Sequence, residues 1–185
     1  MDDLSVLYEK NDTKIIKLDN GNYHLFFSIE NNNMYLDSVI NFDLIKLIYD
    51  LNKDICEKVN LEKHDENTAT ISVLIKNLFE DLGLSQKYSC LQITKSIHNS
   101  QIIFDLNTTI PTKKPEWVTN DMELANIKSI KFISDVSNNR HKINFKCLID
   151  FQENMEAPVF VQKVSVMVIN KIINRLKQFI ENVRV

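Results

Sequence analysis

The chain has 185 residues and a mass of 21.6 kDa, and 44% of its residues are hydrophobic and 25% charged, as is typical of one globular domain with a hydrophobic core. We therefore expect a single domain over residues 1–185. The only two glycines, Gly21 and Gly83, leave no place for a glycine-rich phosphate loop, a dinucleotide-binding fingerprint or a Gly-x-Ser-x-Gly nucleophile motif. The lack of these motifs excludes kinases, P-loop nucleotide hydrolases, Rossmann dehydrogenases and ordinary α/β-hydrolases.

The charge distribution argues against nucleic-acid binding. The formal net charge is −3, and the basic residues include only three arginines, Arg140, Arg175 and Arg184. Phosphate recognition favours clustered positive charge and the bidentate arginine side chain, and the sequence has neither. The abundance of Asn, Ile and Lys indicates an AT-rich genome, such as that of a large DNA virus, a parasite or an AT-rich bacterium.

Cysteine and histidine usage predicts no metal site and no catalytic centre. Cys56, Cys90 and Cys147 are odd in number and widely spaced, which is typical of free thiols in a reducing compartment. The four histidines show no metal-ligand spacing, and no nucleophile, acid or base stands out. We expect a non-enzymatic protein without metal or cofactor. Because the sequence shows neither a signal peptide nor a transmembrane segment, we expect it in the cytoplasm, or in the virion if it is viral.

The hydrophobic pattern predicts an α+β fold. Asn20-Gly21 favours a two-residue type I′ turn in a first hairpin, and Gly83 is expected to cap a helix. Alternation predicts strands, and apolar stripes at helical spacing predict helices. The expected elements are strands 13–18 and 23–30, helices 42–60 and 69–82, strands 88–97, 101–110, 127–136 and 141–151 (the last two joined by a turn over 137–140), and a helix over 158–183. Together they predict a mostly antiparallel sheet with two central helices and a long C-terminal helix packed on it.

Two segments resemble parts of the helix-grip fold of the START and Bet v 1-like lipid-binding superfamily. Residues 91–106 are similar to the START hairpin in the middle of the sheet. Residues 142–151, the loop 152–157 and the helix that begins at Pro158 are similar to its last strand, short loop and closing helix. With the two central helices, the resemblance covers about two thirds of the chain. It implies a hydrophobic ligand or lipid enclosed between the sheet and the long helix, with no catalytic residue required.

The same resemblance implies which side chains line the ligand cavity. They are the inward positions of the strands and of the long helix: Ile102, Phe104, Leu106, Ile130, Phe132, Phe145, Ile149, Val168, Ile172 and Leu176. Ser165 would bind a polar head group, unless its hydroxyl bonds back to its own helix. The alternative is that the helix and the sheet pack directly on each other and leave no cavity.

A second hypothesis is a structural or protein-interaction module, for example a small viral assembly component. Phe160, Val164 and Met167 lie at the edge of the main apolar face of the long helix. An exposed apolar patch of this kind would mark a protein interface. The protein would then bind a protein partner, or a second copy of itself, through the C-terminal helix.

Overall fold

The computed structural model describes residues 5–77, 80–111, 114–136, 140–152 and 159–184. Its main feature is one ten-stranded sheet in the order β1-β2-β3-β10-β9-β7-β6-β5-β4, with β8 paired to β6. Every neighbouring pair along this order is antiparallel, and only the short β8 is parallel to its partner. The strands are β1 (Ser5–Lys10), β2 (Thr13–Lys17), β3 (Tyr23–Glu30), β4 (Cys56–Lys63), β5 (Thr68–Ile75), β6 (Lys87–His98), β7 (Gln101–Thr108), β8 (Glu123–Leu124), β9 (Ile127–Asp135) and β10 (Lys142–Phe151).

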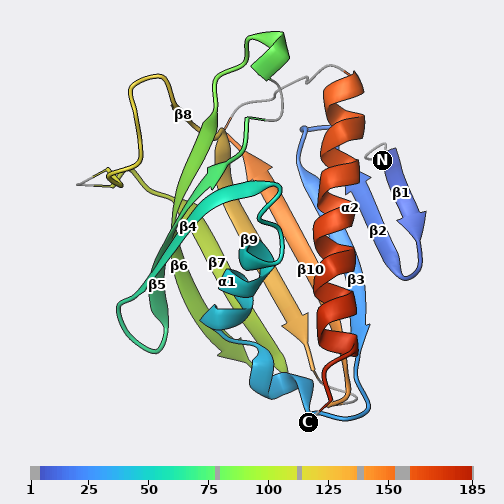
Figure 1. The fold of residues 1–185 in the computed structure, drawn as a ribbon. Helices are drawn as coiled ribbons and strands as arrows, with labels where there is room; N and C mark the ends of the chain where they lie inside the picture. Colours follow the sequence, from blue (N-terminus) through green and yellow to red (C-terminus); the bar gives the residue numbers. More distant parts are fainter. Residues whose placement is uncertain (1–4, 78–79, 112–113, 137–139, 153–158, 185) are drawn as a thin grey trace.

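Two α-helices lie on the same face of this sheet. They are α1 (Phe42–Asp50) and the long α2 (Val159–Glu181), and two short 3-10 turns, η1 (Leu36–Val39) and η2 (Glu80–Leu82), complete the regular structure. Figure 1 shows α2 lying across β3 and β10, with α1 beside it in front of the central strands. The predicted α+β class, with an antiparallel sheet covered by a C-terminal helix, is therefore confirmed.

The predicted helix over 42–60 is correct only in its first half. Asn41 caps the start of α1, because its side-chain oxygen accepts hydrogen bonds from the backbone N–H groups of Asp43 (2.8 Å) and Leu44 (3.2 Å). The helix ends at Asp50, and the buried Asn52 donates a hydrogen bond to the Ile48 carbonyl at 2.6 Å. The chain then enters β4, where pairing with β5 replaces the helical hydrogen bonds.

The predicted second helix over 69–82 is wrong, because most of this segment is β5. Ala69, Ile71 and Val73 alternate toward the main core, while Leu74 is buried on the opposite face of the sheet. A strand buried on both faces presents a continuous apolar run whose periodicity does not separate it from a helix. The β-branched residues of this run were the available signal for a strand. Gly83 has the expected positive φ of 69°, but it follows η2 rather than an α-helix.

The first predicted hairpin is present, but its turn differs. Within this turn only Gly21 has a positive φ (81°), and its N–H donates to the Leu18 carbonyl at 2.9 Å, so the loop has three residues instead of a type I′ pair. The type I′ backbone instead occurs one hairpin earlier. There, Asn11 and Asp12, with φ of 50° and 57°, join β2 to β1, a strand that the sequence pattern did not predict.

The remaining elements agree with the prediction within a few residues. β6 and β7 form the hairpin predicted over 88–110, β9 and β10 form the next one, and α2 is the predicted C-terminal helix. The predicted turn over 137–140 and the predicted helix start at 158 lie largely or wholly outside the described residues. On the outer face of the sheet, Trp117 packs edge-on against Tyr88 at 6.4 Å.

Candidate functional site

A cavity of about 180 Å³ lies between the sheet and the two helices. The sheet supplies its floor from β3, β7, β9 and β10, and α1 and α2 supply its roof. The side chains that line it are Leu25, Phe27, Ile45, Ile48, Tyr49, Leu106, Ile130, Phe132, Cys147, Ile149, Ile169, Ile172, Ile173 and Leu176.

Strand register brings the floor residues together. Cys147 on β10 pairs with Leu25 on β3 and with Phe132 on β9, so the three side chains form a row across the sheet. In the adjacent row, Ile130 on β9 pairs with Ile149 and with Leu106. Because side chains alternate along a strand, residues two apart face the same side, and all of these point toward the helices.

Helical spacing explains which side chains of α1 and α2 form the roof of the cavity. Ile169, Ile172, Ile173 and Leu176 are spaced i, i+3, i+4 and i+7, so they form one stripe of α2 above the floor. On α1, Ile45, Ile48 and Tyr49 follow the same rule. The end of α2 is held by Asn31, which donates hydrogen bonds to the carbonyls of Ile180 and Val183.

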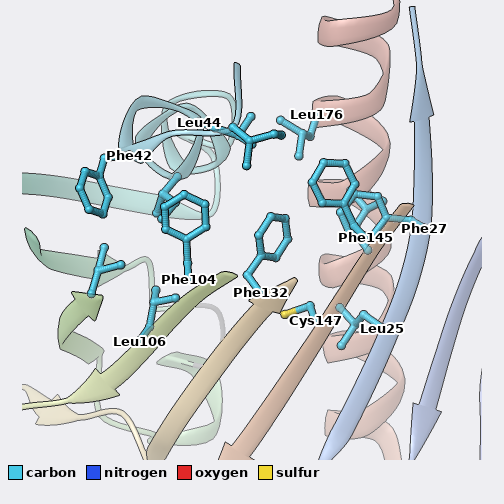
Figure 2. Close-up of a cluster of buried hydrophobic side chains, with 14 of the residues drawn as sticks. Leu25, Phe27, Phe42, Leu44, Phe104, Leu106, Phe132, Phe145, Cys147 and Leu176 are labelled. Atoms are coloured by element: carbon cyan, nitrogen blue, oxygen red, sulfur yellow. The ribbon is translucent and has the colours of Figure 1, made fainter. Parts of the chain in front are cut away.

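Aromatic side chains fill the space next to the cavity. Phe145 stacks on Phe27 with ring centroids 4.8 Å apart and on Phe132 at 5.1 Å. Figure 2 shows these rings grouped close to Leu176 of α2, with Cys147 and Leu25 lower on their strands. Farther along the sheet, the fully buried Phe104 packs against Phe42 at 5.7 Å. This packing leaves the void over one part of the sheet only.

The structure divides the predicted cavity residues into two groups. Six of them line the void: Leu106, Ile130, Phe132, Ile149, Ile172 and Leu176. Ile102, Phe104 and Phe145 are buried in the core outside the lining. Ser165 and Val168 are half-buried on α2 and do not line the void either. Contact of any of these residues with a ligand stays a prediction.

Sequence reasoning missed eight lining residues, although several carried a signal. Cys147 lies between two predicted residues on the same face of β10, and Ile169 and Ile173 flank Ile172 on α2. Leu25 and Phe27 share one face of a predicted strand, opposite His24, Phe26 and Ser28. No local signal identified Ile45, Ile48 and Tyr49, because the position of α1 over the sheet depends on tertiary packing.

A charged cluster ties the segment after α1 to α2. Asp54 Oδ2 accepts hydrogen bonds from Lys171 Nζ at 2.6 Å and from Arg175 Nη2 at 3.1 Å. Arg175 Nη1 also bonds to Asp54 Oδ1, and it donates to Asn52 Oδ1 at 3.0 Å. These bonds from Arg175 and Lys171 hold the pKa of Asp54 well below its usual range. The segment that follows α1 is thereby linked to α2 by charge.

The cavity lining offers no reactive group at neutral pH. Burial raises the pKa of Cys147 to about 12, so its thiol is protonated and a poor nucleophile. Burial also raises the pKa of the Tyr49 phenol. Among the described residues, no three His, Cys, Asp or Glu side chains are grouped as metal ligands.

The predicted interface residues lie on the outside of α2. Phe160 is 51% exposed and Met167 is 70% exposed, while Val164 between them is half-buried. No helix in the described part of the chain is both long enough and apolar enough to cross a membrane.

Comparison with known proteins identifies the fold. No family model matches the chain, and no curated protein is detectably similar in sequence. Solved structures are similar in fold. The human StarD13 (DLC2) lipid transfer and protein localization domain matches with a TM-score of 0.72 at 8% identity, over 99% of this chain and 91% of that one. Human STARD10 matches with a TM-score of 0.67 at 10% identity, over 95% of this chain and 71% of that one.

A bacterial structure gives the same result. The STAR-related lipid transfer protein of Xanthomonas axonopodis matches with a TM-score of 0.67 at 10% identity, over 95% of this chain and 97% of that one. At such low identity the likeness is one of fold. The chain therefore has the helix-grip fold of START domains, as its sequence predicted.

Proposed function

We propose that this protein binds, and transfers, a hydrophobic ligand or lipid in the cavity between α2 and the sheet, without catalysing a reaction. The observation that carries the proposal is the cavity itself, whose 14 lining side chains include 12 with hydrocarbon surface only. Removing apolar ligand surface from water contributes about 25 cal/mol per Å², so such a lining binds without any reacting group. The START fold, which the named lipid-transfer domains share, supports the same proposal.

The cytoplasm is the location that we propose. All three cysteines are buried and free, and free thiols are typical of proteins in reducing compartments. A protein in this compartment can exchange hydrophobic cargo with internal membranes without crossing them.

The experiment that tests the function is native mass spectrometry of the purified protein, followed by denaturing extraction of bound molecules. We expect one hydrophobic molecule per chain. Ile172→Trp should reduce the bound ligand to a small fraction, because the larger indole fills part of the cavity beneath α2.

The matched control for this test is Gln178→Trp, which places the same side chain on an exposed position of α2. This variant should retain the ligand. Circular dichroism of both variants checks that the helix and the sheet are intact. Equal ligand content in the wild type and in a folded Ile172→Trp variant would contradict the proposal.

A second candidate function is protein interaction through α2. The exposure of Phe160 and Met167 favours it, because large apolar side chains that line one helix face are typical of interfaces. This function does not compete for the cavity, since these residues lie outside its lining.

A further inference from the structure

The cavity has very few polar groups. Among its lining side chains only Tyr49 and Cys147 carry a heteroatom, and none is charged. A charged ligand group buried here would lose its hydration without gaining a counter-ion, which is strongly unfavourable. The lining therefore selects against ligands that would bury a phosphate, ammonium or carboxylate group.

Tyr49 is the stronger of the two polar groups. It lies in the last turn of α1, which is fixed at one end by the Asn41 cap and at the other by Asn52. Its side chain lines both the cavity and a surface hollow that Asp50, Lys53 and Glu57 also line. No hydrogen bond to its hydroxyl is present among the described residues.

Tyr49 is half-buried, and its hydroxyl is not one of the fully buried, unpaired side-chain polar atoms of the described residues. Burial raises the pKa of the phenol, and the nearby thiols of Cys56 and Cys147 raise it further. Because no described protein group bonds to this hydroxyl, a ligand in the cavity can supply its hydrogen-bond partner. At neutral pH the phenol is protonated, so it can donate to or accept from a neutral ligand.

The volume limits the size of the ligand. Apolar cavities of about 150 Å³ are known to hold a benzene molecule. The void of about 180 Å³ is slightly larger and suits a compact molecule rather than a two-chain lipid.

We infer that the cavity takes a compact, uncharged, apolar molecule with a single hydroxyl or carbonyl group, which forms a hydrogen bond with the Tyr49 hydroxyl. This inference rests on the proposed function and specifies its ligand class. Neither the fold nor the apolar lining by itself distinguishes such a molecule from a pure hydrocarbon or from a charged lipid.

The test uses three fluorescent probes of similar shape: 2-naphthol, naphthalene and 2-naphthoate. We expect the wild-type protein to bind 2-naphthol about 3- to 10-fold more tightly than naphthalene, as one added hydrogen bond predicts. Binding of the charged 2-naphthoate should be weaker than that of both. Tyr49→Phe should bring the affinity for 2-naphthol down to that for naphthalene and leave naphthalene binding unchanged.

The control variant is Tyr35→Phe, which removes a phenol that is 53% exposed and outside the cavity lining. It should bind all three probes like the wild type. An unchanged preference for 2-naphthol in Tyr49→Phe, or tight binding of 2-naphthoate that Ile172→Trp blocks, would overturn the inference while the proposed function stands. Failure of all three probes to bind the wild type would overturn the inference, and the native mass spectrum of the same protein would show whether the proposed function fails with it.

Discussion

Asn31 holds the C-terminal end of α2 against the sheet side of the molecule through its side-chain amide. It is 2% exposed, and its side-chain N–H₂ group donates to the carbonyls of Ile180 (2.6 Å) and Val183 (2.9 Å). Its side-chain oxygen accepts from the Asn33 N–H at 2.8 Å. The last carbonyls of a helix have no i+4 donor within the helix, and this amide bonds to two carbonyls at that end, of which that of Ile180 also accepts from the Val183 N–H at 3.3 Å.

We predict that Asn31→Ala lowers the free energy of unfolding by about 1–3 kcal/mol, because the Val183 carbonyl loses its side-chain donor and the Ile180 carbonyl keeps only the longer bond from the Val183 N–H. Urea denaturation followed by circular dichroism measures the change. The exposed neighbour Asn32 provides the control, and Asn32→Ala should stay close to the wild type. If Asn31→Ala unfolds at the same urea concentration as the wild type, water replaces the amide at the helix end.

At the scale of elements, the connection between α1 and β4 is held to α2 mainly through Asp54. Its carboxylate is shared by Lys171 and Arg175, one turn apart on α2, and Arg175 also reaches Asn52. Each pair is partly open to solvent, so an isolated pair of this kind contributes little. Together, these bonds orient the loop beside Ile48 and Tyr49, which line the cavity.

The cluster predicts a pH dependence of stability. Because Lys171 and Arg175 lower the pKa of Asp54 in the folded state, its contribution is present above the unfolded-state pKa of about 4 and is lost as the pH falls below it. In urea denaturation between pH 6 and pH 3, the wild type should lose more stability than Asp54→Asn. The exposed Asp81 supplies the control, since Asp81→Asn should follow the wild-type curve. Parallel curves for the wild type and Asp54→Asn would contradict this role.

At the scale of the whole molecule, the second candidate function concerns the outer face of α2, where Phe160 and Met167 are exposed. The second candidate function predicts self-association through Phe160 and Met167. Phe160→Asp should then give a monomer at concentrations where the wild type is a dimer, because burying the introduced carboxylate is unfavourable. Size-exclusion chromatography with light scattering measures the mass.

The matched control for the association test is Val6→Asp, which changes another exposed apolar residue, 49% accessible on the edge strand β1. It should leave the oligomeric state unchanged. A wild-type protein that is monomeric at all concentrations, or a dimer that Phe160→Asp does not alter, would exclude self-association through α2.

The success of sequence reasoning varied with how local the controlling interactions are. The hairpin of β6 and β7 was predictable because alternation and the short turn at Asn99 are properties of neighbouring residues. The strands between Lys53 and Ile75 were not predictable. Ile71, Val73 and Leu74 place apolar side chains on both faces of β5, and this segment is a strand because it pairs with β4 and β6. Without those partners, the run fits a helix equally well.

The sequence by itself determined the α+β class, the antiparallel hairpins, the closing helix and the inward direction of Leu106, Ile130, Phe132 and Ile149. Only the tertiary structure decided that a void remains above them. The inward direction of a side chain follows from the local backbone, whereas an empty space depends on the side chains that approach from elsewhere. Here Phe104 meets Phe42 and is packed, while Phe132 and Cys147 face a space that α1 and α2 cover without filling.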